Sequence, residues 1–229
     1  MICYCRNTKV VGISSLGYDH VQTLGQTIEE IAWQKAGIIK PSSVVVTAAD
    51  QPETALGILA NRAAEKGVSP SSVWNPEPCN ELSELYFQRT LYVVPNFSEY
   101  KSNDDIVLGI RGPVQRLNAS LALQLTNAWM NPQNYPRMVL DSNFSSCIRK
   151  RSWFGFNFTE RKPGEVRRAS AFTLSKEMKD GLRTCSWLGR TQVVECSSKL
   201  SYYLDGAHTS ESIEHCLQWY EKLTAPSSS

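Results

Sequence analysis

Residues 10–20 read VVGISSLGYDH, and this stretch predicts how the fold begins. Its first four residues are mostly β-branched and give way to serines and glycines, as in a buried strand that ends in a ligand-accessible loop. Ligands of open α/β sheets bind at the carboxyl ends of strands, so the Asp19-His20 pair is a candidate site. His20 has two interpretations: an imidazole that ligates a metal beside phosphate oxygens, or a histidine that only hydrogen-bonds its own loop.

A helix is expected soon after this loop, over residues 28–36. Thr27 is placed to cap it, and Glu30 stands three residues further on, which is the spacing of a capping box. Gly37 ends the helix, so Lys35 lies in the last turn, where the helix dipole favours a cation. Taken alone, Lys35 is explained by that preference without any further role.

Strands and helices alternate through the first half of the chain. Strands are expected at residues 43–48, 91–94 and 106–110, and helices at 52–66 and 114–130. The second of these helices carries an apolar stripe spaced by four residues, namely Leu117, Leu121, Leu125 and Trp129. This order predicts an α/β fold in which helices cover a parallel sheet.

Asn118 lies off that stripe, near the start of its helix. A polar amide at such a position can simply face solvent. The functional interpretation is that its side chain points into a binding site.

Residues 187–208 carry a second group of motifs. Trp187-Leu188-Gly189-Arg190 precedes an expected strand at 191–195, and another strand at 201–204 ends in Asp205-Gly206-Ala207-His208. A helix follows, and helix N-termini favour anions. Asp-Gly-x-His alone is weak evidence, but it repeats the pattern of a polar pair at the end of a strand.

Composition limits the classes of partner. The 229 residues are 41% hydrophobic and 20% charged, with a net charge of +2, which is not the footprint of a nucleic-acid-binding protein. Residues 131–168 interleave basic and aromatic side chains, a pattern that can bind single strands but also fits a solvated loop or insertion, which we favour. Because the net charge is close to zero, we expect no nucleic-acid binding. No apolar run is long enough for a membrane span, so we expect no membrane insertion either.

Together the motifs resemble the folylpolyglutamate synthases, ATP-dependent ligases of the Mur ligase superfamily. The similarity covers ISSLGYDH at 13–20, LGQTIEEIAWQKAGIIKP at 24–41, QRLNASLA at 115–122 and the motifs at 187–209. Thr209 after His208 matches the eukaryotic form. Leu188 departs from the family, which usually has proline there, and this change can alter the turn that presents Arg190.

The resemblance implies a domain organisation. Residues 1–170 would be the remainder of a P-loop-type central ATP-binding domain, 171–186 a linker, and 187–229 the first strand-helix unit of a Rossmann-like C-terminal domain. The family's Gly-rich phosphate loop precedes these motifs, and no GxxxxGK[ST] occurs in the 229 residues, so we expect a chain truncated at both ends. It would be either a fragment of a working ligase or a non-catalytic product that binds folate, nucleotide or a partner.

The resemblance also implies a reaction and its residues. A ligase of this type, expected to be monomeric in the cytoplasm, mitochondria or both, adds L-glutamate to the γ-carboxyl of a reduced folate or folylpolyglutamate through an acyl phosphate. His20 would ligate Mg²⁺ and Lys35 would be carbamylated. Arg190 would neutralise phosphate of ATP, and three residues would position the nucleotide: Asn118, Asp205 and His208. A dihydrofolate synthase or bifunctional relative shares these motifs and stays an alternative.

Overall fold

The computed structural model describes residues 8–40, 43–67, 90–112, 114–135 and 164–225. Contacts divide the chain into two compact units. The first unit combines residues 1–94 with 124–169, and the second combines 95–123 with 170–229. Helix α5 (Gln115–Met130) contributes its first half to the second unit and its second half to the first.

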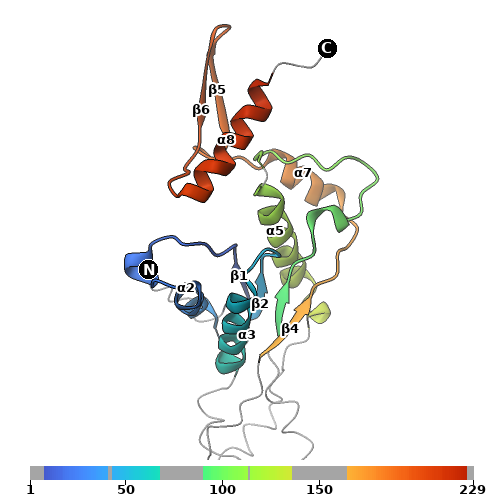
Figure 1. Cartoon of the computed structure of the whole chain (residues 1–229). Coiled ribbons are helices and arrows are strands. Elements are labelled where there is room, and N and C mark those ends of the chain that lie inside the picture. The colour runs from blue at the N-terminus through green and yellow to red at the C-terminus, as the bar shows by residue number, and fades with distance from the viewer. Residues whose placement is uncertain (1–7, 41–42, 68–89, 113, 136–163, 226–229) are drawn as a thin grey trace, which may run out of the picture. The chain divides into compact units, whose positions relative to one another are not determined.

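The first unit is built on a sheet of parallel strands, coloured from blue to orange in Figure 1. In spatial order they are β1 (Val10–Ile13), β2 (Val44–Thr47), β3 (Thr90–Val93) and β4 (Glu165–Arg168). The parallel α/β sheet and its first three strands confirm the prediction. β4 was not expected, because its sequence EVRR carries the charge typical of an edge strand rather than an apolar run. The rest of the basic and aromatic segment, 136–163, lies outside the described residues.

One face of the sheet packs against two helices, α2 (Ile28–Lys35) and α3 (Glu53–Gly67). Val11, Val45 and Leu91 are partners in register on three neighbouring strands, and each is at most 4% exposed. Alternate strand residues point to opposite faces, so Gly12 faces the other side. There a Cβ on Gly12 would lie 2.7 Å from Leu125 of α5, so this glycine lets α5 approach the sheet closely.

The predicted stripe of α5 was partly wrong. Trp129, its last member, is 65% exposed, and the buried positions are Ala119, Ser120, Leu121, Leu123, Gln124 and Ala128. A spacing of four residues turns by about 400° in an α-helix, so each step drifts by about 40° from the starting face. After three steps the stripe has left the buried side.

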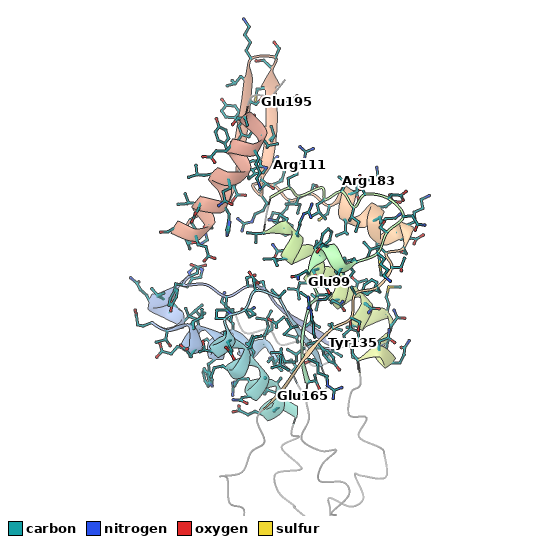
Figure 2. The ribbon with its side chains drawn as sticks, turned by 45° about the vertical axis from the view of Figure 1, so that its right-hand side comes forward. Glu99, Arg111, Tyr135, Glu165, Arg183 and Glu195 are labelled. Carbon is teal, nitrogen blue, oxygen red and sulfur yellow. The ribbon has the colours of Figure 1, made fainter. Side chains whose placement is uncertain are left out.

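Two polar residues of α5 are buried, and each has hydrogen-bond partners. In the second unit, the Ser120 hydroxyl donates to the Pro95 carbonyl at 2.7 Å. In the first unit, the hydroxyl of Tyr135, labelled in Figure 2, donates to the side-chain oxygen of Gln124. Burial raises the pKa of Tyr135, so its hydroxyl remains a donor. Buried polar groups paired in this way specify how the helix is rotated.

In the second unit, the strand expected at residues 106–110 is wrong. The Gly109 N–H donates to the Leu182 carbonyl at 2.9 Å, which ties this segment to α7 (Lys176–Thr184) instead of to a sheet. A Cβ on Gly109 would lie 2.2 Å from the Cys185 carbonyl oxygen, so only glycine allows this approach. Helix α7 lies within residues 171–186, which were expected to form a linker.

The second unit ends in a hairpin and a helix. Strands β5 (Gln192–Ser197) and β6 (Leu200–Leu204) pair antiparallel, and α8 (Ser210–Thr224) follows. Both strands and the helix confirm the predicted elements. Short helices in the described parts of the two units are α1 (Val21–Leu24), η1 (Ala36–Ile38), η2 (Phe97–Glu99) and η3 (Pro132–Asn134).

Among the described residues, no helix has the length and apolar character that crossing a membrane requires.

The start of α2 offers a test of the fold. The Thr27 hydroxyl accepts from the Glu30 N–H at 3.2 Å, and the Glu30 carboxylate accepts from the Thr27 N–H at 3.2 Å, which confirms the capping box. We expect Thr27→Ala to lower the free energy of unfolding by about 1 kcal/mol in urea titrations, because it leaves a backbone donor without its cap. The exposed Thr23→Ala is the control and should change stability by less than about 0.5 kcal/mol. Equal effects of the two variants would contradict the capping assignment.

Candidate functional site

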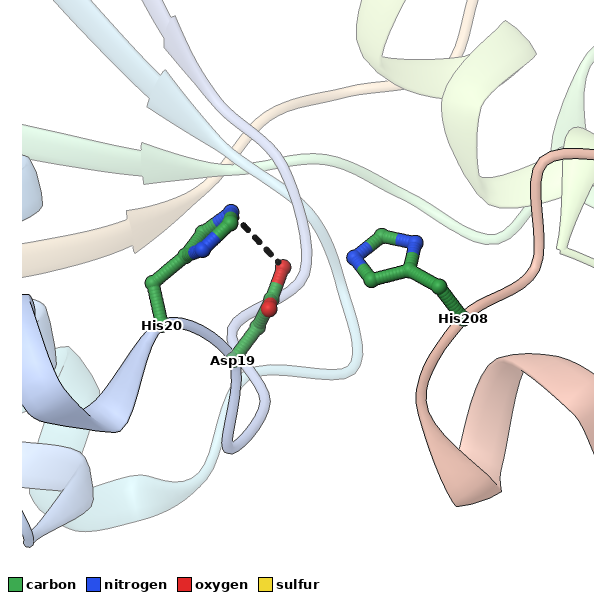
Figure 3. A group of neighbouring side chains, drawn as sticks. All are labelled: Asp19, His20 and His208. Carbon is green, nitrogen blue, oxygen red and sulfur yellow. Dashed lines mark ion pairs between the residues drawn. The ribbon is translucent and has the colours of Figure 1, made fainter.

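The site residues of the first unit lie where β1 ends. Asp19 and His20 follow the loop after β1, and His20 Nε2 lies 3.5 Å from Asp19 Oδ2 (Figure 3). His20 has φ 53°, in the left-handed region, and immediately precedes α1. Its side chain is 67% exposed and that of Asp19 is 33% exposed, so both are accessible from solvent. His208, also labelled in Figure 3, belongs to the second unit.

This pair fits part of a magnesium site. Mg²⁺ is held in proteins by one or two carboxylates, keeps several waters and takes its other ligands from substrate phosphates. The Asp19 carboxylate supplies one such oxygen, and the neighbouring imidazole can supply a nitrogen. The sequence analysis named the Asp19-His20 pair as a candidate site but expected a metal ligand only at His20. Asp19 could have been added as a ligand because it is the adjacent carboxylate.

Lys35 lies in the last turn of α2, as predicted, and it is half-buried. The helix continues into η1 through Ala36, which is fully buried. The stem of Lys35 is therefore held on an anchored helix end. This placement suits both interpretations of Lys35, as a helix-end cation and as a modified residue.

In the second unit, two of the predicted residues line one hollow. Asn118 at the start of α5 and Arg190 before β5 share it with three further residues, Ile110, Gln115 and Trp187. A second open hollow of about 500 Å³ adjoins it through Ile110, Trp187 and Arg190. Arg111 and Glu195, both labelled in Figure 2, line the larger hollow. Residues far apart in the chain are thus brought to one surface, and their roles stay predictions.

Asn118 is exposed, and its amide donates to the Gln115 side-chain oxygen at 3.2 Å. The two residues are three positions apart on α5, so both amides face the same hollow. Asn118 is exposed, as the solvent-facing interpretation expects. It also lines the hollow that contains Arg190, as the functional interpretation expects.

A tight turn presents Arg190. The Arg190 N–H donates to the Trp187 carbonyl at 3.2 Å, and Gly189 has φ 70°. A positive φ at the third position is what a type II turn requires, and proline is common at the second position of that turn. Leu188 occupies this second position and is 84% exposed. The departure from the family's proline therefore leaves the turn intact.

The Asp205 carboxylate ties two loops together. Its Oδ2 accepts from the Thr191 N–H at 2.7 Å, and its Oδ1 accepts from the Ala207 N–H at 2.9 Å. Thr191 has φ 40°, which costs a β-branched residue about 1–3 kcal/mol. A hydrogen bond to a carboxylate contributes about 1.5–3 kcal/mol, enough to offset this strain. In this structure Asp205 holds the backbone around Arg190, a role that the motif alone did not reveal.

Arg190 and His208 both approach Gly206. A Cβ on Gly206 would lie 2.0 Å from Arg190 Nη1 and 2.9 Å from its Cζ, so the guanidinium lies directly against this glycine. His208 Nδ1 lies 3.0 Å from the Gly206 carbonyl oxygen, and the His208 N–H donates to the Ser212 hydroxyl at 3.0 Å. The loop between β6 and α8 therefore sets the positions of both side chains.

Three residues of the hollow were missed as site candidates: Ile110, Gln115 and Trp187. Trp187 is 68% exposed although it is large and mostly apolar. The available signal was a tryptophan at the first position of the turn that ends in Arg190. Ile110 and Gln115 carried no comparable signal. Their positions beside Arg190 depend on long-range packing, which a short stretch of sequence does not show.

Comparisons with known proteins agree with the motifs. No family model matches the chain. The mitochondrial folylpolyglutamate synthase of Cricetulus griseus is 34% identical over 216 residues, which cover 94% of this chain and 30% of that protein. The human mitochondrial enzyme is also 34% identical, over 95% of this chain and 31% of its own length. The resemblance to the eukaryotic enzymes is confirmed, and the chain spans about 30% of the length of these relatives.

Solved structures support the same fold. The apo form of L. casei FPGS superposes with a TM-score of 0.56 at 19% identity, over 95% of this chain and 43% of that one. A Mycobacterium tuberculosis folylpolyglutamate synthase, complexed with ADP and AMPPCP, gives a TM-score of 0.53 at 18% identity, over 91% and 38%. The α/β architecture is therefore shared with part of these proteins.

The turn before Arg190 leads to a paired prediction. We expect Leu188→Pro to raise the free energy of unfolding by about 0.4–1 kcal/mol, because proline restricts the unfolded chain and fits the second turn position. Gly189→Ala should lower it by about 1 kcal/mol or more, because alanine is strained at φ 70°. Thermal and urea unfolding of both variants measures these changes. Destabilisation by Leu188→Pro would mean that the turn is not of type II.

Proposed function

We propose that this chain is the central part of a folylpolyglutamate synthase, and that it supplies nucleotide-binding residues to an ATP-dependent glutamate ligase. The alignment over 94% of the chain with such enzymes is the premise. The single observation that carries the proposal is the shared hollow of Asn118 and Arg190. Asp205 and Gly206 fix the position of this arginine through the contacts described above.

Arg190 is the phosphate-binding residue of the proposed site. Guanidinium groups recognise phosphate through paired, charge-assisted hydrogen bonds. Asn118 can both donate to and accept from a nucleotide, and Asp205 and His208 hold the adjoining loop. Trp187 lines the hollow shared by Asn118 and Arg190 and offers an exposed aromatic face, on which a purine base can stack.

The proposed reaction joins L-glutamate to the γ-carboxyl of a reduced folate or its polyglutamate in two steps. A carboxylate oxygen first bonds to the γ-phosphorus of ATP, and the bond from that phosphorus to the bridging oxygen breaks, releasing ADP. The glutamate amine then attacks the acyl carbon, the bond between this carbon and the phosphate oxygen breaks, and phosphate leaves. The amine gives up its proton to solvent. Arg190 would balance phosphate charge during both steps.

The first unit would contribute to metal binding. Asp19 and His20 are the residues that would hold Mg²⁺, which neutralises charge on the phosphates when bound. We further propose that Lys35 is carbamylated. Its ammonium group would first lose one proton to solvent. The free amine would then add to the carbon of CO₂ and lose a second proton, so that a cation becomes an anion.

A direct test uses the native protein. An antibody raised against residues 187–209 precipitates the protein from its source cells, and the precipitate is assayed for ATP-dependent addition of labelled L-glutamate to tetrahydrofolate. We expect labelled polyglutamate product, with the signal lost when the competing peptide blocks the antibody. A known folate ligase of confirmed activity, assayed in the same way, serves as the positive control. Absence of product from the immunoprecipitate would favour the non-catalytic alternative.

Gly206→Ala tests the placement of Arg190. The new methyl group would displace the guanidinium, which is a flexible side-chain end, so the fold should be retained. Loss of a charge-assisted contact of about 1.5–3 kcal/mol predicts about a tenfold or greater loss of ADP affinity by calorimetry. Gly181→Ala in α7 is the matched control, since its Cβ meets no atom within 4 Å. Unchanged ADP affinity in Gly206→Ala would remove Arg190 from the site.

Trp187→Ala tests the proposed stacking surface. Stacking of a base on an aromatic ring contributes about 1–3 kcal/mol, so we expect ADP affinity to fall about tenfold. Trp187→Phe, which keeps an aromatic face, should retain most of the affinity. Inorganic triphosphate is the comparison ligand, and its affinity should not depend on this side chain. If both ligands lose affinity equally, Trp187 shapes the loop and does not stack.

A further inference from the structure

We infer that Gln51 is a positioning residue for His20: its side-chain amide fixes the loop that carries the imidazole. Gln51 lies between β2 and α3, and it is only 7% exposed. No motif of the sequence singled it out. The proposal rests on the proposed function only for the statement that His20 binds a metal.

The Gln51 side-chain amide both donates and accepts hydrogen bonds at this loop. Its Nε2 donates to the Ser14 carbonyl at 2.7 Å and to the Thr47 hydroxyl at 2.9 Å. Its Oε1 accepts from the Leu16 N–H at 3.1 Å. One side chain from the neighbouring strand's end thus binds both sides of Ser15.

These contacts form a continuous connection between β1 and β2. The Thr47 hydroxyl donates in turn to the Ile13 carbonyl at 3.1 Å, at the end of β1. Beside it, the Ser15 hydroxyl donates to Asp50 Oδ1 at 2.6 Å. The loop therefore leaves the sheet along a path set by side chains of residues 47–51, in addition to its own backbone.

The fixed part of the loop ends close to His20. Leu16 is 8% exposed and packs into the core, so the loop is anchored there by both its N–H and its side chain. The Asp19 N–H then donates to the Gly17 carbonyl at 2.9 Å in a tight turn. The His20 carbonyl accepts from the N–H groups of Thr23 and Leu24, at 2.8 and 2.9 Å. Backbone hydrogen bonds therefore restrain the chain between the Gln51 contact and the residue that carries the imidazole.

Gln51→Met tests this inference, because methionine keeps the length of the side chain and removes all three hydrogen bonds. We expect amide exchange at Leu16 to accelerate about tenfold or more by NMR, and the His20 ring signals to shift or broaden. Mn²⁺, used as the probe metal, should bind about tenfold more weakly, because a loop that is held less firmly orients its metal ligand less precisely.

Gln124→Met is the matched control, because Gln124 is also a buried amide of the first unit, bonded to Tyr135. It should lower stability without changing Leu16 exchange or Mn²⁺ affinity. Thr47→Val is a milder second variant, which removes one partner of Gln51 and should shift the same signals less. Unchanged Leu16 exchange and His20 signals in Gln51→Met, or equal changes in Gln124→Met, would overturn the inference.

Failure of the proposed function is distinguishable from failure of this inference. If Mn²⁺ does not broaden the His20 signals of the unmodified chain, the metal role of His20 is wrong. The Leu16 exchange and the metal-free His20 ring signals still decide whether Gln51 positions this residue.

Discussion

The proposed nucleotide site depends most on the hydrogen bonds that the Asp205 carboxylate accepts. This carboxylate accepts hydrogen bonds from Thr191, which follows Arg190, and from Ala207, which precedes His208. The strained φ of Thr191 is maintained by one of these bonds, and the guanidinium of Arg190 lies against the glycine that follows Asp205. One half-buried charge thus organises two loops, and the positions of the proposed ligand-binding side chains follow from it.

The first unit uses a comparable principle with a neutral group. A parallel sheet leaves its loops at the carboxyl edge without strand hydrogen bonds, so side chains of adjacent loops must supply them. Gln51 does this for the loop after β1 and satisfies backbone groups on both sides of Ser15. Both units therefore place exposed, polar residues on loops that are held by half-buried or buried side chains.

The fold was predictable where apolar runs and capping signals are local. β1, β2, β3 and α2 follow from short β-branched runs and from the Thr27 cap. β4 was missed because an edge strand needs few apolar residues, and the strand expected at 106–110 failed because α7 offers Gly109 a better partner. A short run of apolar residues does not show which distant segment its backbone will hydrogen-bond.

The site residues were predictable as types, through the strand ends and the family resemblance, but not as an arrangement. Arg190 and Asn118 could be named from motifs, whereas their shared hollow depends on long-range packing. The function of Asp205 as a loop clamp, the contact of Gly206 with Arg190 and the role inferred for Gln51 all depend on distances. A single sequence carries no direct signal for them.

The central claim is that residues of the second unit bind the nucleotide. The most direct measurement is a titration of the isotope-labelled chain with AMPPCP, followed through backbone amide signals by NMR. The account predicts that the signals that move are those of residues 187–191 and 205–208 and of the start of α5. Signals that stay unchanged there while nucleotide binds elsewhere, or no change anywhere, would contradict it.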